Sequence, residues 1–251
     1  KMAKENAIIK ELKAVESLGS VSVICSDKTG TLTQNKMTVQ QVYIDGKVLA
    51  PEELSMDVSL HRNLLFNAIL TNDSSIVDGK GIGDPTEYCL IEMTRKLGLN
   101  EEYIRGNMLR LAEVPFDSDR KLMSTKYVVD DNAIIMTKGA LDVLLDRTIN
   151  IRTSEGVRPI TAEDKEAILT TNMKFSENGL RVLAFAYKDT KIDNVLDISD
   201  EYDYTFTGLI SMMDPPRVES AAAVADAKRA GIKPIMITGD HKITATAIAK
   251  Q

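Results

Sequence analysis

The sequence predicts an α/β protein in which both ends of the chain form one domain and the middle forms an inserted α+β domain. Near each end, a short apolar strand runs directly into a polar loop, at Ser20–Cys25 followed by "SDKTGTLT" and at Ile232–Asp240, which ends in "TGD". The middle of the chain instead has strands and helices in separate runs, which is typical of α+β structure. We therefore assign residues 1–38 and 208–251 to the outer domain and residues 39–207 to the insert.

Composition limits the class of protein. The chain has 251 residues, of which 43% are hydrophobic and 27% charged, and this suits one large or two modest globular domains. A formal net charge of −6 disfavours nucleic-acid binding by the chain as a whole. The two cysteines, Cys25 and Cys89, form no CxxC pair, which favours a reducing compartment, and we expect Cys25 to be a small core residue. His61 and His241 are too few to build a zinc cluster.

Neither a membrane helix nor a leader is predicted. No apolar run approaches the roughly 20 residues that a membrane helix needs, and there is no signal peptide. The first and last residues, "KMAKENAIIK" and "TAIAKQ", have the character of helix interiors. We therefore expect a soluble fragment whose ends are cut rather than natural.

The outer domain is predicted as helix, strand, helix, strand and helix. Residues 6–18 carry one apolar helical stripe that stops at Gly19, and Ser20–Cys25 is β-branched and reads as a largely buried strand. Asp214–Gly231 turns into an alanine-rich helix that ends at glycine, and its two prolines fix the backbone as a hinge between the domains. A last strand at Ile232–Asp240 leads into the final helix.

The insert begins with a hairpin over Thr38–Ala50 that turns at Asp45-Gly46. A helix follows at Ser59–Leu70. The next helix, Asp84–Gly98, has aspartate at its cap, proline at its first turn and Glu87 three residues after the cap. Further elements are predicted as strands near Leu109–Val114, Leu122–Val129, Ala133–Thr137, Leu180–Tyr187 and "TFTGLISMM", and as a capped helix at Thr161–Gly179.

Asp27 stands at the tip of the first strand, within "DKTGTLT". Ligands of open α/β sheets bind beyond the carboxyl ends of the strands. A carboxylate there can accept a phosphoryl group, while Lys28 and Mg²⁺ neutralise the crowded oxygens. Gly30 lets the backbone come close, and Thr29 offers a hydroxyl and an amide to phosphate oxygens. A plain strand-ending turn explains Asp27 and Gly30 but not the pattern of threonine and lysine.

Four motifs in this order resemble the cytosolic part of P-type cation-transporting ATPases of the calcium-pump type: "SDKTGTLT", "KGA" at Lys138–Ala140, "DPPR" and "TGD". The resemblance covers nearly the whole chain. It implies a partial haloacid-dehalogenase-like (Rossmann-like) phosphorylation domain with an inserted nucleotide-binding domain. It also implies that Asp27 becomes phosphorylated with Lys28, Thr29 and Thr238 beside it, and that Asp27 and Thr29 hold Mg²⁺.

The resemblance further implies an ATP site. It places Glu87 near the adenine amino group, Phe116 against the adenine ring and Arg181 at the β-phosphate. The other implied nucleotide contacts are Lys121, Lys138, Gly139, Gly239 and Asp240. Most of these residues also have plain structural explanations: a capping box for Glu87, a solvated lysine for Lys138, a strand arginine for Arg181 and a helix cap for Asp240. Ser118 departs from the family, which usually has arginine there.

The function implied is that of a fragment of an ATP-driven cation pump, with Ca²⁺ as the expected ion. The transported cation would bind elsewhere in the parent protein. The implied partners are the actuator domain and the membrane helices of that protein. The resemblance places the present segment on the cytoplasmic side of the membrane. No "GDGxND" loop is present, so we expect the isolated chain to bind nucleotide with little turnover.

Two alternatives remain open from the sequence. The first is a soluble haloacid-dehalogenase-type phosphatase with a large cap. Such phosphatases have a D-x-D motif, and Thr29 stands in the place of its second aspartate, which disfavours this alternative. The second is a non-catalytic nucleotide-binding module. A P-loop enzyme is disfavoured because no G-x-x-x-x-G-K-[ST] occurs.

Overall fold

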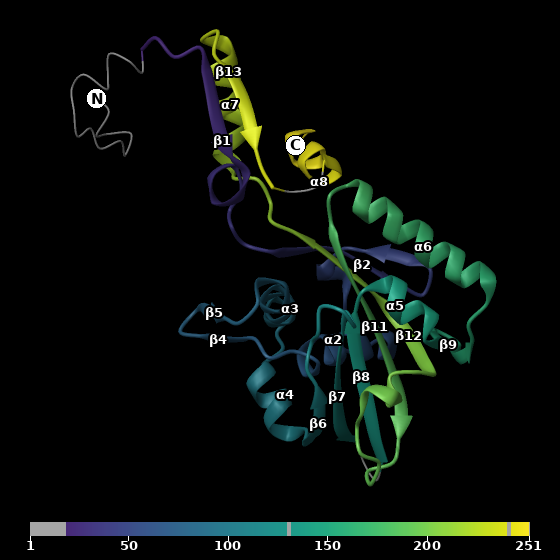
Figure 1. The fold of residues 1–251 in the computed structure, drawn as a ribbon. Helices are drawn as coiled ribbons and strands as arrows, with labels where there is room; N and C mark the ends of the chain where they lie inside the picture. The colour runs from purple at the N-terminus through teal and green to yellow at the C-terminus, as the bar shows by residue number, and fades with distance from the viewer. Residues whose placement is uncertain (1–18, 130–131, 240–241, 251) are drawn as a thin grey trace.

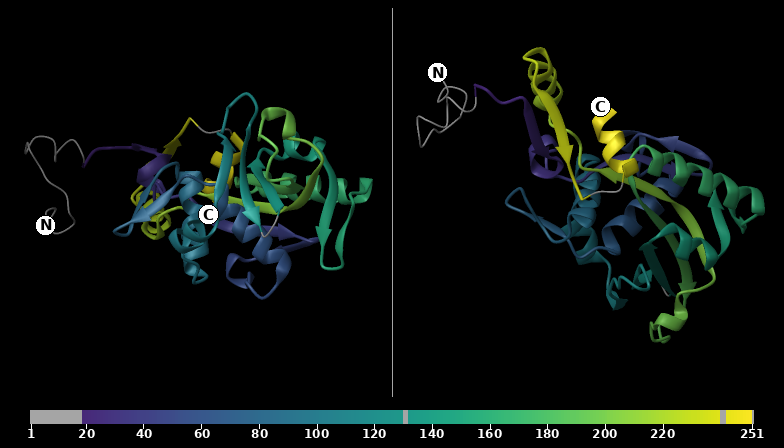
Figure 2. Two further views of the ribbon diagram at one scale, coloured as in Figure 1. Left: turned by 90° about the horizontal axis from the view of Figure 1, so that it is seen from below. Right: turned by 45° about the horizontal axis from the view of Figure 1, so that its top comes forward.

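The computed structural model describes residues 19–129, 132–239 and 242–250 and contains two separate main groups of strands. In the smaller group, β1 (Val23–Asp27) pairs in parallel with β13 (Lys233–Ile237), and helix α7 (Val218–Arg229) packs on β13. Figures 1 and 2 show that this unit stands at one end of the molecule, beside rather than within the large sheet. The α/β class predicted from the sequence is confirmed.

The larger group is a nine-stranded mixed sheet in the order β10-β9-β12-β11-β8-β7-β6, with β2 also paired to β12 and β3 to β2. Its strands are β2 (Thr38–Ile44), β3 (Lys47–Leu49), β6 (Arg110–Val114), β7 (Leu122–Val129), β8 (Asn132–Gly139), β9 (Thr148–Thr153), β10 (Gly156–Pro159), β11 (Arg181–Thr190) and β12 (Tyr204–Met213). Strand β12 is paired on both sides, with β11 on one and with β2 and β9 on the other. It is buried along its whole length because helices also cover both faces to which its side chains point.

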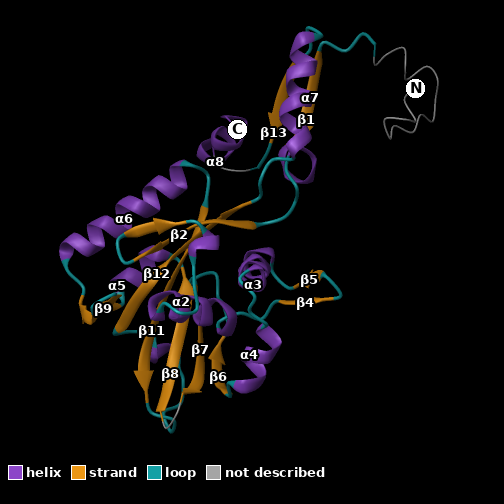
Figure 3. Cartoon of the chain, turned by 180° about the vertical axis from the view of Figure 1, so that it is seen from behind, coloured by secondary structure: helices purple, strands orange, loops and turns teal. Residues whose placement is uncertain are grey.

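Helices cover both faces of this sheet, as Figure 3 shows from behind. The helices of the chain from residue 51 onward are short turns at Pro51–Glu53 and Ile198–Asp200, α2 (Ser59–Leu70), α3 (Pro85–Lys96), α4 (Glu101–Asn107), α5 (Leu141–Asp146), α6 (Ala162–Glu177), α7 and α8 (Lys242–Lys250). A small separate hairpin, β4 (Ser75–Val77) with β5 (Lys80–Ile82), lies between α2 and α3 in the chain.

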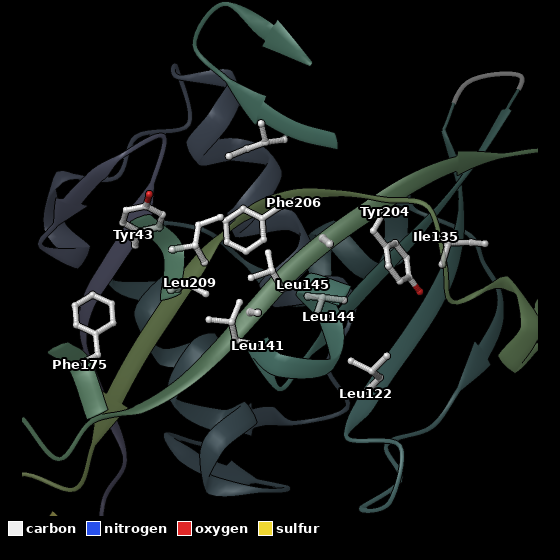
Figure 4. Packing of buried hydrophobic residues seen from close by; sticks show 14 of the residues in the cluster. Tyr43, Leu122, Ile135, Leu141, Leu144, Leu145, Phe175, Tyr204, Phe206 and Leu209 are labelled. Carbon is white, nitrogen blue, oxygen red and sulfur yellow. The ribbon is translucent and has the colours of Figure 1, made fainter. Parts of the chain in front are cut away.

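The core alternates across the sheet because successive strand residues point to opposite faces. Tyr43 of β2 packs with residues of α5 and α6, whereas its neighbours Val42 and Ile44 pack with α2 and α3. Leu209 and Ile210 of β12 divide in the same way. Figure 4 shows the first of these two clusters, gathered under α5 and the end of α6.

Most predicted elements of the insert are confirmed. The hairpin turns at Asp45-Gly46, where φ is +49° and +73°, as a tight two-residue turn requires. The helix predicted at Ser59–Leu70 has the bounds of α2. The hairpins β4–β5 and β9–β10 and the helices α4 and α5 were not predicted, because each is short and carries little periodic signal.

Strand β1 is not buried, which corrects the prediction for Ser20–Cys25. Val23, Ile24 and Cys25 are exposed, so the expectation that Cys25 is a core residue is wrong. The physical reason is that β1 pairs with β13 alone in a two-stranded sheet, and two strands cannot bury both of their faces. The predicted helix at residues 6–18 and the predicted turn at residues 130–131 lie outside the described residues.

Strand β12 runs through the predicted domain boundary between residues 207 and 208. Its ladder with β2 continues to Met213, which is opposite Thr38. The large sheet therefore ends at Met213, one residue before Asp214. The division of the chain into two domains stays a prediction.

Candidate functional site

Three neighbouring strands of the large sheet, β7, β8 and β11, bring predicted site residues together where β8 ends. This row of strand ends is called the sheet edge below. Strand β7 begins where β8 ends, since Gly139 is opposite Leu122. Strand β11 begins at Arg181, three residues before Ala184, which is also opposite Gly139. Lys121 precedes β7, Lys138 and Gly139 finish β8, and Arg181 starts β11. The antiparallel order thus places together residues that are about 60 positions apart in sequence.

Lys138 is buried in an ion pair with Glu87. Its exposed fraction is 5%, and its Nζ donates to Glu87 Oε1 and to the backbone oxygen of Thr71. Burial lowers the pKa of the Lys138 ammonium, and the Glu87 carboxylate partly offsets that effect. The explanation of Lys138 as a solvated lysine is therefore wrong.

The Glu87 carboxylate also holds the segment that follows α2. Its Oε2 accepts from the backbone N–H of Asp73 at 3.0 Å and from Ser74 Oγ at 3.4 Å. Asp84 does cap α3, because its Oδ1 accepts from Thr86 N at 2.7 Å. Glu87 itself points to Lys138, so capping alone does not explain it.

Gly139 lies where a side chain has no room. A Cβ atom there would come within 2.2 Å of the backbone oxygen of Lys121 and 2.7 Å of Leu122 Cδ2. That same oxygen accepts from Ala140 N at 3.1 Å, which fixes the Lys121 backbone against the end of β8. The Lys121 ammonium lies 3.2 Å from Asp142 Oδ2, with both side chains exposed. The glycine therefore allows the backbones of β7 and β8 to approach closely.

Phe116 and Arg181 complete this edge. Phe116 is 61% exposed and lies in the loop that leads from β6 to Lys121. Arg181 donates from Nη1 to Thr86 Oγ1 at 2.9 Å and so links β11 to the start of α3. An exposed aromatic ring with cationic side chains along one sheet edge can hold a flat base and anionic phosphates.

The loop after β1 presents Asp27 to solvent. The Asp27 Oδ1 accepts from Thr29 N at 3.2 Å, whereas the side chain of Lys28 is buried. Asp27 is opposite Ile237 in the parallel pairing, so Thr238 follows directly on the neighbouring strand. Gly239 comes next, and Asp240 lies outside the described residues.

The Asp27 loop is tied to the segment that leaves β12. Asp214 accepts from Thr33 Oγ1 at 2.5 Å and from Lys36 N at 3.0 Å, and Arg217 donates to the backbone oxygen of Gly30 at 3.0 Å. Beside this junction is a cavity of about 350 Å³ whose lining includes both Lys28 and Arg181. One predicted site residue of each group, Lys28 and Arg181, thus lines the same cavity.

Asp27 could bind a magnesium ion through its carboxylate. Among the described residues, no three histidine, cysteine, aspartate or glutamate side chains form a group that could hold a metal. Mg²⁺ in phosphate chemistry commonly uses one or two carboxylates together with substrate phosphates and waters. Asp27 is exposed and supplies one such carboxylate.

Sequence reasoning missed several partners at the site. Thr71, Asp73 and Ser74 bind Lys138 or Glu87, and Asp142 pairs with Lys121. None belongs to a motif, and three of them act through backbone atoms or an Oγ atom. The sequence indicates for Asp214 only a place in a hinge. In the structure, its carboxylate joins the segment that leaves β12 to the segment that enters β2.

Fold and site define an α/β protein with two features. A buried lysine–glutamate pair lies at the end of strand β8 in the large sheet, and an exposed aspartate ends a strand of the separate parallel pair. Residues 61–219 match the family described as P-type ATPase, cytoplasmic domain N. The whole chain is 46% identical to calcium-transporting ATPase 1 of Bacillus cereus, 47% to a calcium-transporting ATPase of Listeria monocytogenes and 48% to calcium-transporting ATPase 1 of Lactococcus lactis.

The chain belongs to the P-type ATPase family, since the family match covers more than half of it. It spans 28% to 29% of the length of those three relatives. In the described part of the chain, no helix has both the length and the apolar character needed to cross a bilayer.

Proposed function

We propose that this chain binds ATP at the sheet edge formed by β7, β8 and β11 and carries, in Asp27, the aspartate that accepts the γ-phosphoryl group in a cation-transporting ATPase. The observation that carries the proposal is the buried Lys138–Glu87 pair next to Gly139. Burying an ammonium group costs free energy even when it is paired, so such a pair at an accessible sheet edge favours a functional role over a structural one.

The arrangement suits adenine at one end of the site and phosphates at the other. The exposed ring of Phe116 offers a stacking surface, and Glu87 and Lys138 offer an acceptor and a donor for the edge of a base. Lys121 and Arg181 offer positive charge to the phosphates. The cavity that both Arg181 and Lys28 line supports a path from this edge towards Asp27.

At Asp27, a carboxylate oxygen would bond to the γ-phosphorus while the bond to the bridging oxygen of ADP breaks. Lys28, Thr29 and Thr238 would hold the phosphoryl oxygens. Mg²⁺, held by Asp27 and Thr29, would supply charge neutralisation. The parallel pairing of β1 with β13 supports a haloacid-dehalogenase-like domain from residues 1–38 and from the segment after β12.

The names of the relatives support a proposal for the transported ion. Three proteins that are 46% to 48% identical carry the name calcium-transporting ATPase, so we propose Ca²⁺ as the cargo of the parent protein. The remaining partners would be the actuator domain and membrane helices of the same pump, with this segment on the cytoplasmic side. Family membership disfavours the soluble phosphatase.

Calorimetric titration with ATP tests the nucleotide site. Phe116→Ala removes a stacking contact of about 1 kcal/mol, so the dissociation constant should rise roughly fivefold. Tyr103→Ala is the matched control, because Tyr103 is also an exposed aromatic residue but lies on α4. Equal affinity in wild type and Phe116→Ala would contradict the assignment of Phe116.

Labelling with γ-labelled ATP tests Asp27 in the parent protein. An acid-stable, hydroxylamine-sensitive label should form and should be absent in Asp27→Asn, because an amide cannot form the acyl phosphate. Asp226→Asn, on the exposed surface of α7, should label like wild type. A label that persists in Asp27→Asn would show that another residue is the acceptor.

A further inference from the structure

We propose that Glu201 is a positioning residue for nucleotide binding, and that it acts through Arg120 on the loop that carries Phe116 and Lys121. This inference rests on the proposed ATP site but concerns Glu201, which no motif includes, and Arg120, a residue of the "PFDSDRK" stretch to which the sequence assigned no role. Glu201 lies between the short turn Ile198–Asp200 and β12, and it has no exposed surface. A fully buried carboxylate needs hydrogen bonds and opposite charge to be tolerated.

Two guanidinium groups and a hydroxyl meet the Glu201 carboxylate. Arg120 Nη1 donates to Oε1, Ser124 Oγ donates to the same oxygen at 2.6 Å, and Arg147 Nη1 donates to Oε2 at 3.3 Å. Ser124 in turn hydrogen-bonds Thr137 on β8 at 2.8 Å. The carboxylate is therefore held from β7 and from the chain just after α5.

Arg120 carries this support into the nucleotide loop. While Nη1 binds Glu201, Nη2 donates to the backbone oxygen of Pro115, the residue just before Phe116. One guanidinium group thus joins the start of the loop, at Pro115, to the buried Glu201 carboxylate. Arg120 is nearly buried, with 9% of its side chain exposed, so the loop is fastened from its inner side.

The rest of the loop is a short turn around Asp117. Its Oδ1 accepts from Asp119 N at 3.0 Å and from Arg120 N at 2.9 Å, and its backbone oxygen accepts from Lys121 N at 2.6 Å. These bonds define the shape of the turn, but they lie within the loop itself. Lys121 is also held directly at the end of β8, because its backbone oxygen accepts from Ala140 N at 3.1 Å. The contact from Arg120 to Glu201 therefore acts mainly on the exposed start of the loop, where Phe116 lies.

A loop that is held before ligand arrives loses less conformational entropy on binding. Glu201 cannot touch nucleotide itself, because it is fully buried. Its effect on affinity must therefore pass through its partners, and of these Arg120 is the one that also binds the loop, at Pro115.

The chain provides a matched pair of variants. Arg120→Met and Arg147→Met each remove one guanidinium group from the same carboxylate. The Arg147 guanidinium donates to the carboxylate and to the backbone oxygen of Glu201 and lies 4.8 Å from the centre of the Tyr202 ring. Within the described residues, no hydrogen bond joins it to the loop. We expect both variants to lower thermal stability, whereas only Arg120→Met should weaken ATP binding, by about three- to tenfold. Glu201→Gln should weaken ATP binding to a similar degree.

Hydrogen exchange in the absence of nucleotide supplies a second readout. The amides of Asp119, Arg120 and Lys121 should exchange faster in Arg120→Met and Glu201→Gln than in Arg147→Met. A double variant with Phe116→Ala should show less than the sum of the two affinity losses, because both changes act on one contact.

The outcomes separate the inference from the proposed function. If Phe116→Ala weakens ATP binding but Arg120→Met and Glu201→Gln do not, the ATP site stands and the positioning role is overturned. Equal loss of affinity in Arg147→Met would also overturn it, because the effect would then be general destabilisation. If the folded wild-type chain binds no ATP, the proposed site fails and the inference fails with it.

Discussion

At the scale of single residues, Lys138 shows how burial changes the role of a side chain. Its ammonium group sits at the end of β8 with Glu87 and the Thr71 backbone as partners, and burial lowers its pKa. A lysine in water would carry its proton well beyond neutral pH and would be free to move. Here it is buried and held by its two partners.

Glu87→Gln should lower the free energy of unfolding by about 3 kcal/mol at pH 7, because it leaves a buried ammonium group without its counter-charge. Lys138 would then have a still lower pKa in the folded state. Because the unfolded chain binds more protons above that folded pKa, stability rises with pH there. The gap between variant and wild type should therefore narrow from pH 7 to pH 10, as measured by urea unfolding.

Glu92→Gln is the control for that experiment. Glu92 also lies on α3 and pairs with a lysine, Lys36, but 42% of that lysine's side chain is exposed, against 6% for Lys138. The loss should be at most about 1 kcal/mol, as for a surface pair. Equal losses in the two variants would contradict the special role of the Lys138 pair.

At the level of residues, motifs anticipated which side chains lie close together, whereas their binding roles stay predictions, and the prediction of burial failed where it depends on neighbours. The residues Lys138, Gly139 and Lys121 were named from sequence, and the structure brings them to one edge. Cys25 was misjudged, because an apolar strand reads as buried whether or not other elements cover it. Glu201 and Arg120 gave no signal, because their pairing joins positions 81 residues apart.

At the scale of elements, α6 shows how local sequence determines a boundary. Thr161 and Asp164 form a reciprocal capping box, with Thr161 Oγ1 accepting from Asp164 N at 3.2 Å and Asp164 Oδ2 accepting from Thr161 N at 2.9 Å. Arg158 adds two bonds to the same carboxylate, at 2.5 and 2.9 Å. The sequence predicts this helix well, since caps act within a few residues.

Asp164→Asn should cost about 1 kcal/mol at pH 7, the usual value of a helix cap. Its bonds with Arg158, followed by those with Thr161, hold the pKa of Asp164 well below its ordinary range. A carboxyl group with a depressed folded pKa stabilises the fold above its unfolded pKa, and that stability is lost as pH falls through the folded pKa. The difference from wild type should therefore shrink steadily below about pH 4.

Thermal unfolding across that pH range measures the effect. Asp226→Asn is the control, since its pair with Arg229 is exposed on α7 and should matter little. A difference for Asp164→Asn that stays constant down to the lowest pH would show that the charge is not the cause.

At the scale of the whole molecule, the arrangement of strands explains why the site could be only partly predicted. Parallel pairing of β1 with β13 joins residues over 200 positions apart, and β12 passes from the large sheet into the segment that holds the Asp27 loop. Motifs at both ends indicated a shared outer domain. The large sheet reaches Met213 because β12 pairs there with β2. No local sequence pattern reveals this pairing.

This organisation gives the molecule a junction with two chain crossings. Residues 33–37 lead from the Asp27 loop into β2, and Asp214–Arg217 lead out of β12. Asp214 binds the first crossing through Thr33 and Lys36, so the crossings are joined to each other. The sheet edge that holds Lys138 ends next to this junction, because Arg181 is opposite Met212.

The most direct test of the ATP site is a titration of the 251-residue chain with ATP, followed residue by residue through amide chemical shifts. Our account predicts the largest shifts at Phe116, Lys121, Gly139 and Arg181, on one edge of the sheet. Residues at the opposite end of β8 and β11, such as Ala133 and Asp189, should change little. Saturable shifts centred on that opposite end, with the Lys138 edge unchanged, would contradict the account.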